Sequence, residues 1–94
     1  MDRYETVMII NKNIDEKNKN KIIDDIKKCI LENGKIIKEE DLGTKLLAYE
    51  VKGHKEANYY LIEFESNQET SEKLETIYRN LDEILKFIVV KLDW

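Results

Sequence analysis

Residues 4–34 have the sequence YETVMIINKNIDEKNKNKIIDDIKKCILENG, in which a strand pattern is joined to a helix pattern by one short polar turn. Tyr4–Ile10 are rich in β-branched and aromatic residues, which favour an extended strand. Asp15 can cap the following helix, because its carboxylate accepts hydrogen bonds from the free amides of the first turn. Apolar residues then recur at helical spacing at Ile22, Ile23, Ile26 and Ile30. This stretch predicts a strand and a helix that ends at Gly34, which we expect in the left-handed conformation of a C-terminal cap.

The second strand is predicted over residues 35–52, with a break in the middle. Residues 35–42 and 46–52 have strand composition, and Gly43 stands between them. A glycine inside a strand pattern indicates a bulge or a bend. Residues 53–57 have the length of a hairpin loop, and a third strand is expected at Asn58–Glu65.

The remaining residues predict a second helix and a last strand. Asn67 can cap the helix, whose apolar positions recur at Leu74, Ile77, Tyr78 and Leu81. Lys86–Leu92 form the last strand. The order βαββαβ predicts an α+β, ferredoxin-like fold, with a four-stranded antiparallel sheet and both helices on one face. We expect strands one and four near the centre of the sheet, or flanked by strands two and three. The 94 residues have room for one core, so residues 1–94 are expected to form a single domain.

Composition excludes several classes of protein. The net charge is −4, which does not draw the chain toward nucleic acid at long range but leaves room for a local basic patch. A single cysteine, Cys29, cannot form an intrachain disulfide and fits a reducing compartment such as the cytoplasm. No stretch approaches the ~20 apolar residues of a membrane span. Secreted disulfide-linked and integral membrane proteins are therefore excluded, and no membrane partner is expected.

Two helices can cover only one face of a four-stranded sheet, so the other face must meet water or a partner. Thr6, Met8 and Ile10 are expected to point toward the helices. The opposite alternation places a set of apolar residues on the uncovered face: Val7, Ile9, Tyr59, Leu61, Ile88 and Val90. Large apolar groups on such a face favour a docking surface for a partner. The alternative is that strand-forming residues are tolerated on a half-wetted sheet.

Catalytic chemistry has few candidate residues. Cys29 lies on the apolar stripe of its helix, which is typical of a small core residue. His54 is the only histidine and falls in a polar loop, and the carboxylates of residues 39–41 alternate between faces, as in a solvated edge strand. No metal site, cofactor or small-molecule substrate is expected. An acylphosphatase shares this fold, but its arginine is missing from the loop after the first strand. An RNA-recognition motif also shares the fold, but its glycine–aromatic signature is absent.

Several blocks in order resemble the bacterial ribosomal small-subunit protein six family. The opening residues 3–11, RYETVMIIN, are similar to the start of that family, and residues 31–35, LENGK, to its helix end. The block at residues 43–52, GTKLLAYEVK, is similar to its signature G-x-R/K-x-L-A-Y-x-I. Residues 78–91 resemble its C-terminal block. Lys45 and Lys86 stand where the family often has arginine, which is better suited to bidentate phosphate contacts.

The resemblance implies a non-enzymatic ribosomal protein in the cytoplasm. It would bind the central domain of 16S rRNA in the small subunit, together with ribosomal small-subunit protein eighteen. In the signature block, Leu47 is expected in the core and Tyr49 packed across strands. A regulatory or ligand-sensing domain that dimerises through its open sheet face stays as the alternative. The residues implied on the RNA side are Arg3, Tyr4, Lys45, Arg79, Lys86 and Lys91.

Overall fold

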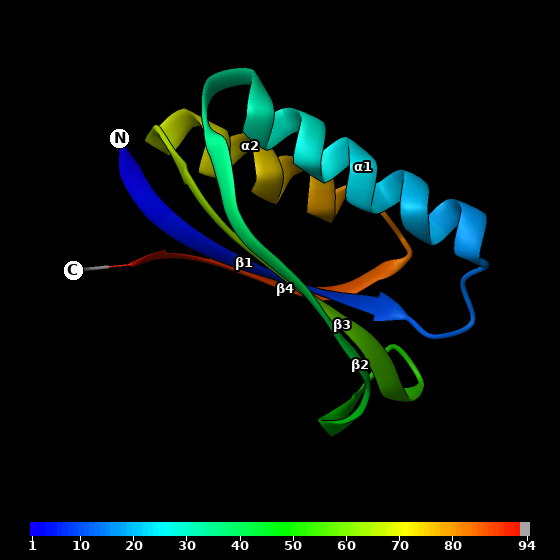
Figure 1. Cartoon of the computed structure of the whole chain (residues 1–94). Coiled ribbons are helices and arrows are strands. Elements are labelled where there is room, and N and C mark those ends of the chain that lie inside the picture. The colour runs from blue at the N-terminus through cyan, green and yellow to red at the C-terminus, as the bar shows by residue number, and fades with distance from the viewer. Residues whose placement is uncertain (93–94) are drawn as a thin grey trace.

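The computed structural model describes residues 1–92 and contains the six elements predicted from the sequence, in the same order (Figure 1). Both helices lie on one face of the sheet, and its strands are antiparallel. The predicted ferredoxin-like fold is therefore confirmed. The elements are β1 (Asp2–Asn11), α1 (Glu16–Asn33), β2 (Lys35–Val51), β3 (His54–Ser66), α2 (Gln68–Arg79) and β4 (Ile84–Leu92).

The strand order in the sheet is β2-β3-β1-β4. The prediction that strands one and four lie near the centre is wrong for β4, which is an edge strand. A short hairpin keeps β3 beside β2, and β3 also pairs with β1. The crossover through α2 therefore returns β4 to the only free side of β1, where it gains a single neighbour.

Both predicted helix caps are confirmed. The Asp15 carboxylate accepts a hydrogen bond from the amide of Asn18 at 2.8 Å, and the Asn67 side chain accepts one from the amide of Thr70 at 3.1 Å. The prediction for Gly34 is wrong, because its backbone is extended, with φ −162° and ψ −161°. A Cβ atom at Gly34 would collide with the carbonyl oxygen of Glu65. Glycine is required there for the close approach of the chain to β3.

The expected bulge in the second strand is confirmed at Gly43, which has φ +78° and lies at a shift in the register between β2 and β3. The turn into β3 is shorter than the predicted loop of residues 53–57. Lys52 and Gly53 both have positive φ, and β3 already begins at His54. Two residues of this conformation suit the right-handed twist of the strands that they connect.

The main core lies between the sheet and the helices. Thr6, Met8 and Ile10 of β1 point toward the helices and are fully buried, as predicted. Cys29 is also buried, which confirms it as a core residue. Its neighbours in this core are Tyr4, Ile22, Ile23, Ile26, Ile30, Ile62, Phe64, Leu74, Tyr78 and Ile84.

One buried hydrogen bond joins β1 to α2 within this core. The hydroxyl groups of Thr6 and Tyr78 lie 2.7 Å apart. Burial raises the pKa of the Tyr78 phenol well above its ordinary value. The folded protein therefore keeps this phenol neutral at a pH where the unfolded chain ionises it.

We expect Tyr78→Phe to lower the free energy of unfolding by about 1–3 kcal/mol at pH 7, because the Thr6 hydroxyl is left buried without its partner. The pKa of the Tyr78 phenol is higher in the folded than in the unfolded protein. Its contribution to stability is therefore fully present below the pKa of the unfolded chain, about 10, and is lost as the pH rises above that value. Urea unfolding at pH 7 and pH 11 should therefore show a smaller alkaline loss in Tyr78→Phe than in the unmodified protein. A second change, Thr6→Val, should restore part of the stability. A double variant no more stable than Tyr78→Phe would contradict this assignment.

Candidate functional site

The uncovered face of the sheet carries an apolar strip at its centre. Val7 of β1 lies directly opposite Leu61 of β3 on one side and Ile88 of β4 on the other. Val90 follows two positions along β4, and the side chains of Ile88 and Val90 are 43% and 42% exposed. We call Val7, Leu61, Ile88 and Val90 the open-face patch. All four lie on the face that the sequence alternation predicted.

Ile9 lies on the same face but is only 5% exposed. It packs with Ala57 and Leu85 in a second small cluster, which Leu47 and Val51 of β2 help to cover. The prediction that Ile9 contacts a partner is therefore wrong, because the end of the β2–β3 hairpin closes over it. Tyr59, directly opposite Ile9 on β3, stays partly exposed beside this cluster.

Acidic side chains lie next to the open-face patch. Glu5 of β1 and Glu63 of β3 are directly opposite each other in the register. Like charges in this arrangement repel, and a cation that binds between or beside them relieves the repulsion. Glu65, one row further, lies opposite Arg3 and has its carboxylate 3.7 Å from the Lys35 ammonium group. Lys38 of β2 lies opposite Glu63 on its other side, so Glu5, between Glu63 and Val90, is the carboxylate with which a cationic side chain of a partner would pair.

Three cations from three elements surround one surface hollow of about 340 Å³. Lys52 comes from the β2–β3 turn, Arg79 from the last turn of α2 and Lys86 from β4. Among the described residues that line it, Asp82 is the one acidic side chain. None of the three cations forms an ion pair with a carboxylate of residues 1–92. We call Lys52, Arg79 and Lys86, with the hollow between them, the cationic hollow.

The cationic hollow brings together two of the residues predicted on the RNA side, Arg79 and Lys86. The guanidinium carbon of Arg79 lies 5.9 Å from the centre of the Phe87 ring, which helps to hold the side chain in place. Lys52 was not among the residues predicted on the RNA side. Its position at the end of the signature block, next to Gly53, could have pointed to it. Only the geometry of the hairpin shows that Lys52 lines the same hollow as Arg79 and Lys86.

The other residues predicted on the RNA side lie elsewhere. Lys45 is exposed on β2, Arg3 lies at the far end of β1 from Lys86, and the ammonium group of Lys91 is 3.5 Å from the Asp2 carboxylate. The prediction that Tyr4 contacts RNA is wrong. Its ring is buried in the core and stacks on Phe64, with ring centroids 5.5 Å apart, so it cannot stack on a sugar or a base.

The end of the β2–β3 hairpin carries two large apolar side chains in water. Leu46 and Tyr49 are 75% and 83% exposed. The prediction that Tyr49 packs across strands is wrong, because β1 ends opposite Ala57 and, within residues 1–92, no third strand continues beside this part of the hairpin. Figure 1 shows the hairpin extending beyond the sheet on the side away from the helices. Exposed apolar groups next to Lys45 and Lys52 mark this tip as a further candidate contact surface.

The structure gives little support to catalytic or metal chemistry in the part of the chain that it describes. Residues 1–92 contain no group of three or more His, Cys, Asp or Glu side chains arranged to hold a metal ion. Burial raises the pKa of the Cys29 thiol, which disfavours the reactive thiolate. Glu39 and Asp41 are exposed on the edge strand β2 and pair with Lys27 and Lys19 of α1, which confirms the prediction of a solvated edge. No helix within this range has the length and apolar character that a membrane crossing requires.

Comparisons with known proteins agree on one family. The family model described as ribosomal protein S6 matches residues 3–91. The small ribosomal subunit protein bS6 of Heliobacterium modesticaldum is 32% identical, with 99% of this chain and 98% of the relative covered. The same protein of Rickettsia bellii is 33% identical over 99% of this chain and 78% of the relative.

A solved structure gives the same result. The crystal structure of 30S ribosomal protein S6 from Thermotoga maritima superimposes with a TM-score of 0.89 at 32% sequence identity. The superposition covers 97% of this chain and 87% of that one. Fold and sequence thus agree along almost the whole length. The chain therefore belongs to the ribosomal protein S6 family, whose members are structural, non-enzymatic components of the small ribosomal subunit in the cytoplasm.

Proposed function

We propose that this protein binds the central domain of 16S rRNA together with ribosomal small-subunit protein eighteen. In this proposal the open-face patch contacts the partner protein and the cationic hollow contacts RNA phosphates. The observation that carries it is the different chemical character of these two adjoining surfaces. An apolar patch with acidic neighbours occupies the middle of the sheet, and a group of three cations lies at one end of it.

The surroundings of the open-face patch support a basic protein partner. Val7, Leu61 and Ile88 provide a continuous apolar row across three strands. Glu5 and Glu63 flank that row, and Glu5 would pair with a lysine or arginine side chain of the partner. RNA fits this surface poorly, because its phosphates would meet the two carboxylates.

The cationic hollow supports a phosphate contact. Lys and Arg side chains bind phosphate oxygens through charge-assisted hydrogen bonds. Three cations are few, however, and the whole chain has a net charge of −4. We therefore expect weak RNA binding by this protein alone and a shallow dependence on salt, with tighter binding when a basic partner adds its own phosphate contacts.

A gel-shift titration with a central-domain 16S rRNA fragment, with and without protein eighteen, tests the proposal at two salt concentrations. We expect tight binding only in the three-component mixture. Absence of binding in both mixtures, with both proteins shown to be folded by circular dichroism, would overturn it. Size-exclusion chromatography with light scattering on the protein alone tests the alternative, which requires a dimer at micromolar concentration.

We expect Ile88→Asp to weaken assembly of the three-component complex by about tenfold or more, because it places a charge in the centre of a surface that must lose water. The matched control is Leu31→Asp, an equal change at an exposed apolar residue of α1 on the helix side of the molecule. Gel shift measures assembly, and thermal unfolding checks that both variants fold. Equal assembly by the two variants would show that the open-face patch is not the docking surface.

A further inference from the structure

We propose that the groove between α1 and α2 binds a positively charged segment of another protein. The segment would place one aliphatic side chain on the groove floor and arginine or lysine side chains on its rim. This inference concerns the helix layer, which the sheet separates from the open-face patch, and it does not rest on the proposed function (Figure 1). The groove has a volume of about 640 Å³ and is lined by Asp25, Cys29, Glu32, Glu69, Glu72, Lys73, Thr76 and Ile77.

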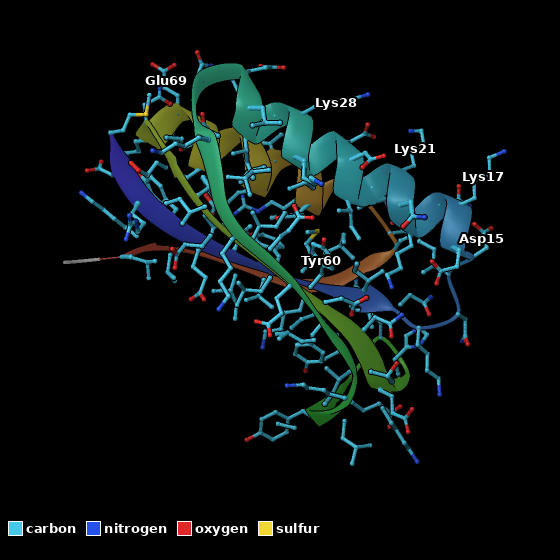
Figure 2. All side chains as sticks on the ribbon, viewed as in Figure 1. Asp15, Lys17, Lys21, Lys28, Tyr60 and Glu69 are labelled. Atoms are coloured by element: carbon cyan, nitrogen blue, oxygen red, sulfur yellow. The ribbon has the colours of Figure 1, made fainter. Side chains whose placement is uncertain are left out.

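Helical spacing brings these side chains to the same groove. Asp25, Cys29 and Glu32 are separated by four and three residues and so form one stripe along α1. Glu69, Glu72 and Thr76 form the corresponding stripe along α2, beginning in its first turn, where Figure 2 shows Glu69. The two stripes line opposite sides of one open groove.

The groove is strongly acidic. Four carboxylates and one ammonium group line it, which gives a net charge of −3. Asp25 is partly neutralised by Lys21, whose ammonium group lies 3.4 Å from its carboxylate. Glu32 and Glu69 form no ion pair with any side chain of residues 1–92. The groove therefore attracts cations and repels RNA phosphates, so a basic protein segment is the macromolecule that it fits.

The floor of the groove is apolar. Cys29 is buried, and Ile77 packs against the main core. Burial raises the pKa of the Cys29 thiol, and the nearby Glu32 carboxylate raises it further, while the Lys73 ammonium group lowers it. An apolar floor inside a charged rim is the usual arrangement of a surface that holds one buried side chain and several paired charges.

The probe is a fluorescein-labelled alanine-based peptide with one central leucine and two arginines on each side. The control peptide has glutamine in place of each arginine. Fluorescence anisotropy of the folded, full-length protein should show saturable binding of the arginine peptide and none of the control. In NMR spectra, the amide shifts should move most along α1 and α2 at the groove. Shifts confined to the sheet would overturn the proposal.

The variant Glu32→Gln/Glu69→Gln tests the groove, and Glu40→Gln/Glu50→Gln on β2 is the control with the same change in net charge. We expect about a tenfold weaker affinity for the arginine peptide in the groove variant, since two rim charges are lost, and little change in the control. An equal loss in both would show only general attraction to an acidic protein and would overturn the site. Circular dichroism confirms that both variants fold. The ribosomal assembly experiment uses different residues, so the two proposals can fail separately.

Discussion

Phe64→Ala is expected to lower the free energy of unfolding by about 3–5 kcal/mol, because it removes a fully buried ring from the centre of the main core. The ring of Phe64 stacks on Tyr4, which would lose this contact and face a cavity. Domains of this size have a free energy of unfolding of about 5–15 kcal/mol, so the substitution would remove a large fraction of the stability. The midpoint of thermal unfolding should fall by roughly 15–30 °C.

Tyr49→Ala is the matched control for this prediction. It removes an aromatic ring of similar size from a side chain that is almost fully exposed. We expect its unfolding free energy to change by less than about 0.5 kcal/mol. Differential scanning calorimetry of the two variants measures both effects. A large loss of stability in Tyr49→Ala would mean that the hairpin end packs against the rest of the protein.

Replacing Lys52, Arg79 and Lys86 by alanine together is expected to weaken binding of the central-domain RNA by about 10–100-fold in the presence of the partner protein. Each phosphate contact that is lost should reduce the magnitude of the slope of log affinity against log salt by about 0.7–0.9, so the loss of three contacts should reduce it by about 2–3. Because all three side chains lie at the surface of one hollow, stability should change little. Filter binding over a series of salt concentrations measures both the affinity and the slope.

The control for the triple variant is the replacement of Lys17, Lys21 and Lys28 by alanine. These side chains point away from the sheet on the outer side of α1, and the change in net charge is the same (Figure 2). We expect at most a small loss of affinity in this control. If both triple variants weaken RNA binding equally and with the same salt slope, the RNA contact depends on overall charge and not on the cationic hollow.

The sequence predicted the order of the elements and the side of the sheet on which most residues lie. Alternation placed Thr6, Met8 and Ile10 toward the helices and Val7 and Ile88 on the open face, and the structure agrees. These are local properties, because the strand period of two and the helix period of 3.6 act over neighbouring residues. The same alternation places Tyr4 beside Thr6 on the inner face. Only the family resemblance had put Tyr4 on the RNA side, and there the local pattern was the better guide.

Features that depend on contacts between distant residues could not be predicted in this way. The alternation along β1 places Ile9 on the uncovered face, yet the end of the β2–β3 hairpin packs over its side chain. Tyr49 was expected to pack across strands, yet within residues 1–92 it has no partner in the β2–β3 register and stays exposed. In both cases burial depends on where another part of the chain ends, and periodicity holds no information about that.

Local patterns and the signature block of residues 43–52 were therefore enough to predict the family, the fold and the apolar face. Which charged side chains lie together depends on how distant segments of the chain pack. Lys52 joins Arg79 and Lys86 only because the turn after β2 and the end of α2 reach the same end of the sheet. The acidic groove exists only because α1 and α2 pack side by side. The interaction between two charges depends on the distance between them in space, and for residues far apart in the sequence only the folded structure sets that distance.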